Sequence, residues 1–370
     1  MEIEDINLIP INSTTLNANL TSTVFPISET FYGHNFFIST LIAYLIIGLV
    51  GNGLLSFYMF WKIRKISVND VQILNLALAD FLYVIASALN IMPVYLQSVK
   101  KPIYSHNDFE CRFRYGLMVA FAVADIFIMT IMAFTRYIMM AYPHRYKNWC
   151  TPKNSIIAVM LSWLLAILSA SPSTFGFFTK FTYFPTVGLC LISHTANQPL
   201  EDIIVLLAAT VIYYVMPTVI IGTCYYKIYI IVRKSKQNLQ VHNLPEPKNN
   251  RIKYSKKETK LTVTFFIIFF VYFISFTPYT IINVLQMFNA VAYSLHTTYT
   301  LLLVVCINSI INPYIFLIRS QKFQNTFRRL FYKNFSKKVR VIPASTQTDS
   351  AKTVGNQHPK RTLSTRLGIC

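Results

Sequence analysis

The sequence predicts an all-α membrane protein built as a seven-transmembrane helix bundle. Hydrophobic residues make up 54% of the 370 residues and charged residues only 13%. The mean hydropathy is +0.44, well above that of ordinary soluble domains. Seven apolar stretches reach the length of about 20 residues that a bilayer-spanning helix needs. They lie at 36–61, 71–97, 113–142, 155–178, 202–232, 261–287 and 296–318.

The basic residues predict the orientation of these helices. With the N-terminus outside the cell, most of the 34 Lys and Arg residues lie in the cytoplasm. The few that remain outside are Lys100, Lys101, Arg112, Arg114 and Lys180. The positive-inside rule therefore predicts a multi-pass plasma-membrane protein with an extracellular N-terminus and a cytoplasmic C-terminus. A basic segment followed by an early apolar core is missing, so we expect the first helix to direct insertion.

The extracellular side carries the features expected of secreted chain segments. Asn12 and Asn19 begin glycosylation sequons in the N-terminal tail. Cys111, at the start of the third span, and Cys190, before the fifth, are the two of six cysteines that fall on the extracellular side. Because the extracellular side is oxidising, we expect them to form a disulfide that holds the second outer loop over the bundle.

The net charge of +20 does not indicate a nucleic-acid-binding protein. The positive charge lies in cytoplasmic segments next to the membrane. There it determines topology and contacts anionic lipid. No nucleic-acid partner is expected.

Two acids lie inside apolar spans, Asp80 in the second and Asp125 in the third. An ionised side chain in hydrocarbon is costly, so such acids face the bundle interior and mark function. Further polar residues occur within other spans, namely Asn52, Asn308, Ser309 and Asn312. A polar core of this kind is typical of a conformational switch.

Short motifs follow one another in order, one set per span. They are Gly51-Asn52, Leu76-Ala77-Leu78-Ala79-Asp80, Thr135-Arg136-Tyr137, Trp163, Pro217 with Tyr225, Phe276-Thr277-Pro278, and Asn308-Ser309 with Asn312-Pro313-Tyr314-Ile315-Phe316. Over about residues 33–333 the chain resembles the rhodopsin-like (class A) G protein-coupled receptors. The third-span ending and the loop YFPTVGLC further resemble melatonin receptors and related invertebrate orphan receptors. The resemblance implies a receptor that senses an extracellular ligand and activates heterotrimeric G proteins.

The resemblance also implies a coupling switch at the cytoplasmic ends of the third and sixth spans. Glu258 would clamp Arg136 in the resting state, and outward movement of the sixth helix about Pro278 would open a cleft for the G protein. The simpler alternative is that Arg136 is a snorkelling membrane anchor. The residues implied in the switch are Arg136, Tyr137, Tyr225, Glu258, Phe276, Pro278, Asn312, Pro313 and Phe316.

Three residues depart from the family pattern. Thr135 replaces the acid that usually precedes the arginine, so Arg136 depends more on Glu258. Phe276 replaces a tryptophan beneath the ligand pocket, and Phe316 replaces a tyrosine whose hydroxyl could pair through water with Tyr225. The first change favours basal activation, whereas the last weakens the active state.

The polar core matches the sodium pocket of the family through Asp80, Asn308, Ser309 and Asn312. Hard oxygen ligands around a partly hydrated cation explain an ionised acid at this depth. Asp125 stands where the family usually has serine, so we expect either unusually strong sodium binding or one retained proton. The alternative is a protonated, hydrogen-bonded Asp125. Apart from this allosteric sodium, no cofactor is expected.

The ligand is expected to be a neutral, moderately apolar small molecule, with a peptide as the second choice. A retinal pigment needs a Schiff-base lysine in the seventh span, where Cys306 stands, and Met118 replaces the aspartate of amine receptors. Melatonin receptors use a fifth-span histidine, which is Tyr213 here. The expected pocket residues are Met118, Val119, Ala122, Tyr213, Tyr279, Thr280, Asn283, Leu302 and Cys306; the alternative is that they only pack the bundle.

The chain divides into an extracellular tail at 1–35, the receptor bundle at 36–319, an amphipathic eighth helix along the membrane at 320–333, and a flexible cytoplasmic tail at 334–370. Ser and Thr residues in that tail would dock arrestin after phosphorylation by a receptor kinase. A transporter, the competing class, often has internal repeats, and none is evident. Motifs of an intramembrane enzyme are missing as well.

Overall fold

The computed structural model describes residues 31–61, 66–96, 109–177, 181–184, 189–192, 200–241, 250–288, 290–291, 295–319 and 324. The predicted glycosylation sites Asn12 and Asn19, the C-terminal tail and nearly all of the predicted eighth helix lie outside these residues.

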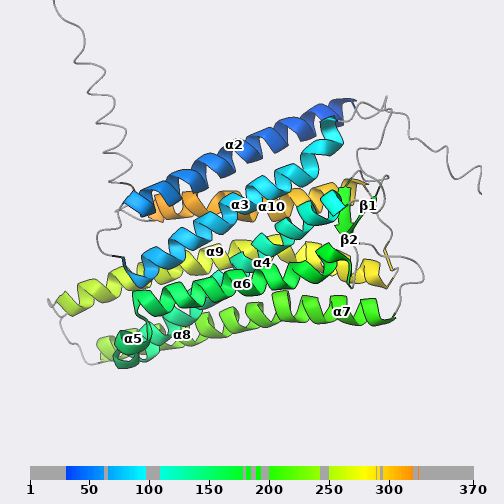
Figure 1. Cartoon of the computed structure of the whole chain (residues 1–370). Coiled ribbons are helices and arrows are strands. Elements are labelled where there is room, and N and C mark those ends of the chain that lie inside the picture. Colours follow the sequence, from blue (N-terminus) through cyan, green and yellow to red (C-terminus); the bar gives the residue numbers. More distant parts are fainter. Residues whose placement is uncertain are drawn as a thin grey trace, which may run out of the picture. The chain divides into compact units, whose positions relative to one another are not determined.

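The described elements run in the order shown in Figure 1. They are α2 (Phe31–Trp61), α3 (Val68–Leu96), α4 (Phe109–Ala141), α5 (Pro143–Trp149), α6 (Pro152–Phe175), β1 (Phe181–Phe184), β2 (Leu189–Ile192), α7 (Leu200–Thr210), the π-helical segment η2 (Val211–Val215), α8 (Met216–Val241), α9 (Asn250–Met287) and α10 (Leu295–Arg319).

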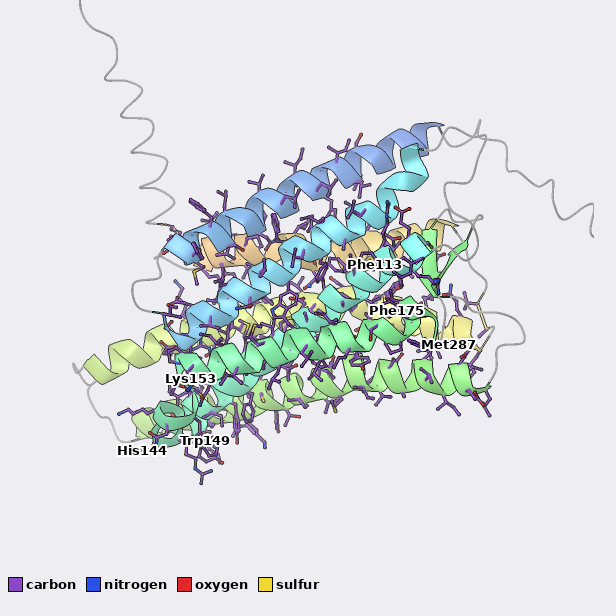
Figure 2. The ribbon with its side chains drawn as sticks, in the orientation of Figure 1. Phe113, His144, Trp149, Lys153, Phe175 and Met287 are labelled. Atoms are coloured by element: carbon purple, nitrogen blue, oxygen red, sulfur yellow. The ribbon has the colours of Figure 1, made fainter. Side chains whose placement is uncertain are left out.

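Within the described residues, seven helical segments are long and apolar enough to cross a membrane, which confirms the predicted bundle. They cover 39–60, 68–90, 109–141, 152–175, 200–235, 258–287 and 300–319. The fifth of them combines α7, η2 and α8. Consecutive spans run in opposite directions (Figure 1), so that Phe113, Phe175 and Met287 lie at one end of the bundle and His144, Trp149 and Lys153 at the other (Figure 2).

Local sequence signals set the ends of several helices. Ser67 and Asp70 exchange hydrogen bonds at the start of α3: Asp70 Oδ2 accepts from the Ser67 amide at 3.1 Å, and Ser67 Oγ accepts from the Asp70 amide at 3.2 Å. The Thr151 side chain caps α6 ahead of Pro152. Gly176 ends α6 with a left-handed φ of 79°, a conformation that glycine adopts at little cost.

Helix α4 lies at the centre of the bundle and contacts α3, α6, α8 and α9. Its Ala124, Ile128 and Ala133 are fully buried. Helices α6 and α8 instead expose large apolar side chains, with Met160 at 62% and Tyr226 at 65% exposure. Exposure of this kind is expected of helix faces that contact lipid, since contact of apolar side chains with lipid tails costs no free energy.

A π-helical turn in the fifth span directs two neighbouring tyrosines to different helices. The turn covers Val211–Val215 and ends two residues before Pro217, and such single turns often accompany functional sites. Tyr213 packs edge-on against Phe127 of α4, with ring centroids 6.1 Å apart. The hydroxyl of Tyr214 lies 2.6 Å from Thr277 Oγ1 of α9. The fifth span therefore contacts both α4 and α9 at this level.

The loop after α6 folds into an antiparallel hairpin of β1 and β2, in which Tyr183 pairs with Cys190. This hairpin is an addition to the predicted helical bundle. Both strands contact α4. Cys111, at the start of α4, is 1% exposed and disulfide-bonded. The side chain of its predicted partner, Cys190, is outside the described part of the chain. Cys150, Cys224 and Cys306 are free thiols.

The contact between α4 and α6 depends on a glycine. A Cβ atom added to Gly116 would meet Thr174 Oγ1 at 2.0 Å. We therefore expect Gly116→Ala to cost about 1–3 kcal/mol by overpacking and to lower the apparent melting temperature of the solubilised protein by at least about 2 °C. Gly222 of α8 is the matched control, because a Cβ there meets nothing within 4 Å. Equal melting temperatures for Gly116→Ala and Gly222→Ala would contradict this expectation, and adding Thr174→Ala should restore much of the loss.

Candidate functional site

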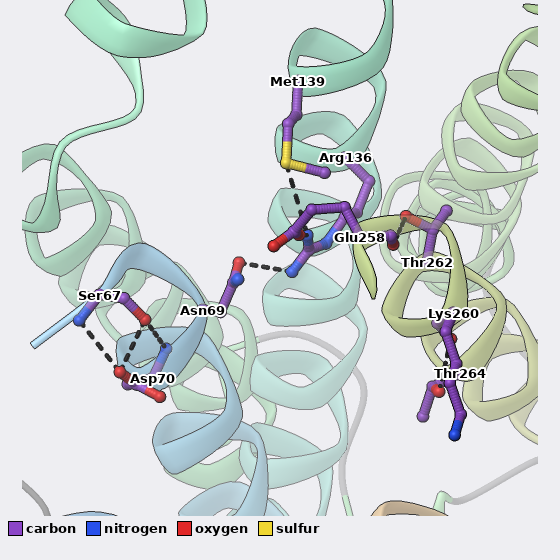
Figure 3. A network of polar contacts seen from close by, with 9 residues as sticks. All are labelled: Ser67, Asn69, Asp70, Arg136, Met139, Glu258, Lys260, Thr262 and Thr264. Carbon is purple, nitrogen blue, oxygen red and sulfur yellow. Dashed lines mark hydrogen bonds and ion pairs between the residues drawn. The ribbon is translucent and has the colours of Figure 1, made fainter. Parts of the chain in front are cut away.

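A buried ion pair joins α4 to α9. Arg136 Nη1 lies 2.7 Å from Glu258 Oε2, and the two side chains are 0% and 9% exposed. The Arg136 guanidinium also lies over the ring of Phe265, 4.7 Å from its centroid. Removing one partner from such a pair leaves an uncompensated buried charge. This ion pair therefore fixes the distance between the two helices at this end of the bundle (Figure 3).

Helix α3 supplies further polar contacts at the same level. Asn69 Oδ1 accepts from Arg136 Nη2 (Figure 3), and Gln72 Nε2 donates to Thr135 Oγ1 at 2.9 Å. Thr135, which replaces the family acid, is therefore paired to α3 and not to its neighbour Arg136. Sequence reasoning missed Asn69, although its place at the start of the second span puts it level with Arg136.

The other expected switch residues differ in whether they pack near this ion pair. Tyr225 is buried and packs edge-on against Phe266, with ring centroids 5.2 Å apart. Phe316 of α10 packs edge-on against Phe265, which itself contacts Arg136. Tyr137 points elsewhere: the Lys227 Nζ lies over its ring at 5.5 Å. Tyr137 therefore faces α8, not the ion pair.

The prolines and Phe276 lie within continuous helices. Pro278 is inside α9 and Pro313 inside α10. The Phe276 ring stacks on Tyr272, with centroids 4.4 Å apart. A helix lacks one backbone hydrogen bond at each proline, so α9 has its weakest point between the ion pair and the opposite end of the bundle.

The polar residues of the spans gather into one buried network. Asn312 Nδ2 donates to Asp80 Oδ2 at 2.7 Å, and Asn308 Nδ2 donates to Asp125 Oδ2 at 3.1 Å. Asn52 Nδ2 donates to the Ser309 carbonyl at 2.7 Å. These side chains are all at most 4% exposed. The network connects α2, α3, α4 and α10.

Several oxygens of this network have no hydrogen-bond partner although they are buried. They are Oδ1 of Asn52, Asp80, Asp125, Asn308 and Asn312. The two carboxylates also interact electrostatically. Among the described residues no group of three His, Cys, Asp or Glu side chains could hold a metal ion. A cation here would rely on two carboxylates with amide and hydroxyl oxygens, a hard donor set that fits sodium.

Most of the expected ligand-pocket residues meet in one apolar cluster. Met118, Leu302 and Cys306 are buried in it, and Val119, Ala122 and Tyr279 pack against it. Tyr213 belongs to a different cluster, formed with Val123, Ala124 and Ala166. The structure thus groups six of the expected residues and places Tyr213 against a separate cluster of α4 and α6 residues.

The polar members of the expected pocket bond within their own helix. Asn283 Nδ2 donates to the Tyr279 carbonyl at 2.8 Å, and Thr280 Oγ1 donates to the Phe276 carbonyl at 2.9 Å. The Tyr279 hydroxyl instead crosses to α4 and lies 2.7 Å from the hydroxyl of Tyr115. Tyr115 was missed by sequence reasoning, because a tyrosine in an apolar span has no distinctive pattern.

Comparison with known proteins gives consistent matches along the chain. The family described as 7 transmembrane receptor (rhodopsin family) matches residues 51–316. The human cysteinyl leukotriene receptor 1 is 30% identical over 200 residues, covering 53% of this chain and 58% of that receptor. The melatonin receptor type 1A of Phodopus sungorus is 22% identical over 311 residues, 82% of each chain.

The fold itself is that of a solved structure. Squid rhodopsin superposes with a TM-score of 0.69 at 18% identity, covering 86% of this chain and 90% of that one. The chain spans little more than half the length of the leukotriene receptors that it matches, 56% for the pig protein.

Proposed function

The chain belongs to the rhodopsin family of seven-transmembrane receptors, and from that premise we propose that it activates heterotrimeric G proteins by moving α9 away from α4. Members of this family signal through G proteins and are receptors, not enzymes. The observation that carries the proposal is the buried ion pair between Arg136 and Glu258 at 2.7 Å. It joins the two helices that must separate, and Pro278 gives α9 a point about which to bend.

Activation is a shift between two packings of the bundle. In the resting packing Arg136 is held by Glu258 and by Asn69. Outward movement of α9 separates Glu258 from Arg136 and frees the guanidinium. The freed group, with five N–H donors, then offers hydrogen bonds to the G protein. A ligand drives this shift only in proportion to its preference for the open packing.

The ligand side of the proposal depends on the cluster beneath the hairpin. Met118, Leu302 and Cys306 give apolar walls, and the Tyr115–Tyr279 hydroxyl pair gives a polar contact between α4 and α9. A neutral, moderately apolar molecule with one hydrogen-bonding group fits these walls, and a peptide is the second candidate. A ligand that inserted between the two hydroxyls would loosen α9 at its outer end.

The names of the relatives suggest two small-molecule ligands, cysteinyl leukotrienes and melatonin. Neither is assigned here. Met118 is one of several third-span residues in the cluster, and the fifth-span Tyr213 packs its ring on Phe127 and not into the cluster. Both molecules belong in a ligand screen as first probes.

Sodium is proposed as an allosteric inhibitor in the pocket of Asp80 and Asp125. Bound there, it would supply positive charge that holds α3, α4 and α10 together.

Extracellular placement of the N-terminus is supported by the distribution of Lys and Arg. The C-terminal tail is proposed to bind arrestin after phosphorylation by a receptor kinase.

The test is ligand-free activation of a panel of G proteins in cells, with Arg136→Ala as the comparison at matched surface expression. We expect measurable basal signalling through at least one G protein and its loss in the variant. Because the assay is ligand-free, the loss of signalling would reflect the missing guanidinium and not a loss of ligand binding. Basal signalling that survives in Arg136→Ala would contradict the proposal.

A further inference from the structure

A pocket of about 320 Å³ lies between the end of α4 and the middle of α8, at the end of the bundle that carries Arg136. It is lined by Tyr137, Met140, Ala141, Tyr142, Lys227, Ile230 and Ile231. We propose that this pocket binds one anionic phospholipid of the cytoplasmic leaflet, with the phosphate on Lys227 and the tyrosine hydroxyls. The leaflet assignment depends on the proposed orientation of the chain.

The polar half of the pocket is positively charged. Lys227 Nζ lies 5.5 Å from the ring centroid of Tyr137, and Tyr137 packs edge-on against Tyr142 at 6.0 Å. Arg145 of α5 lies over the Tyr142 ring, 5.3 Å from its centroid. No lining residue is acidic. One lining cation, Lys227, and two phenol groups, with Arg145 next to Tyr142 but outside the lining, suit a phosphate group.

These cations are available for a ligand. The ion pairs seen among the described residues join other groups, Arg114 with Glu110 and Arg136 with Glu258. Neither Lys227 nor Arg145 has a carboxylate within ion-pair distance in this part of the chain. Their ring contacts fix the direction of the side chains without neutralising the charge.

The apolar half of the pocket suits a hydrocarbon chain. Met140, Ile230 and Ile231 line it, and the adjoining face of α8 exposes Tyr226 at 65% and Tyr229 at 60%. The membrane-spanning segments end at Ala141 and Ser235, so the pocket lies near the level where lipid headgroups meet acyl chains. A free phosphate would use the cations only, whereas a phospholipid covers both halves.

Binding at this place would connect three elements beside the ion pair. Tyr137 directly follows Arg136, Tyr142 precedes α5, and Lys227 belongs to α8. The lipid would therefore hold the end of α4 against α8. Binding of the lipid to the protein can be measured without any assumption about G protein coupling.

The experiment uses the purified full-length protein in phosphatidylcholine nanodiscs that contain dioleoyl phosphatidic acid, with retained lipid measured by native mass spectrometry. Lys227→Gln should lower phosphatidic acid retention about fivefold, the attraction that one lysine has for an anionic membrane. Lys234→Gln is the matched control, since it removes an exposed charge on the same helix outside the pocket, and it should retain lipid like the wild type. Ala141→Phe should fill the pocket and lower retention as well.

Three results would overturn the proposal. Lys227→Gln could retain as much phosphatidic acid as the wild type. Lys234→Gln could lose as much as Lys227→Gln, which would indicate diffuse attraction to the bilayer. Glycerol 3-phosphate could displace the lipid completely at low concentration, which would assign the site to a soluble phosphate. Equal melting temperatures of the variants exclude misfolding as the cause of a loss.

Discussion

Replacing Glu258 by glutamine raises ligand-free G protein activation about tenfold. The substitution keeps the size of the side chain but removes the charge that faces Arg136 at 2.7 Å. Losing one partner of a buried ion pair costs the packing that contains it about 3–5 kcal/mol. Glutamine can still accept one hydrogen bond, so we expect only about 1.4 kcal/mol of this to appear as a tenfold shift toward the open packing. Basal signalling per receptor at the cell surface measures the shift.

Glu201→Gln is the control for this measurement. Glu201 is an exposed acid in the first turn of α7, so the same chemical change there leaves basal activity as it was. Arg136→Ala should abolish the activity that Glu258→Gln raises, because the freed guanidinium is then missing. Unchanged or lower basal signalling in Glu258→Gln would mean that the ion pair does not oppose activation.

The sequence predicted the depth of each switch residue in the membrane better than the neighbouring helix toward which its side chain points. The resemblance to the rhodopsin-like receptors implied that Glu258 would contact Arg136, and the structure places the two side chains 2.7 Å apart. Tyr137 was grouped with them but faces Lys227. Topology fixes the depth of a residue in the membrane, whereas its direction depends on the rotation of the helix.

That rotation is difficult to predict when a span is apolar on every side. Tyr213 and Tyr214 show the problem, because a π-helical turn sends one to Phe127 of α4 and the other to Thr277 of α9. In a soluble helix the polar face would indicate the direction. In a membrane span, polar residues alone give that indication, which explains why the acids and asparagines could be grouped from the sequence whereas the tyrosine contacts were missed.

Asp125→Asn is expected to weaken sodium binding about tenfold, because sites of this kind set cation affinity by the number of charged ligands. Asp125 and Asp80 interact electrostatically inside a buried site, and a cation between two carboxylates relieves their repulsion. In the wild type, sodium should raise the melting temperature and lower basal signalling relative to N-methyl-D-glucamine chloride at equal ionic strength. Both responses should require higher sodium concentrations in Asp125→Asn.

The pH dependence separates the two roles that Asp125 can have. If both acids ligate sodium, protons compete with the ion, so acidification should weaken the sodium response of the wild type and affect Asp125→Asn less. If Asp125 stays protonated and only accepts the hydrogen bond from Asn308 at 3.1 Å, asparagine replaces it with little change in either response. Asp202→Asn, at the start of α7 outside the pocket, should leave both responses intact. An Asp125→Asn receptor whose sodium and pH responses match the wild type would therefore leave Asp80 as the single charged ligand and give Asp125 a packing role.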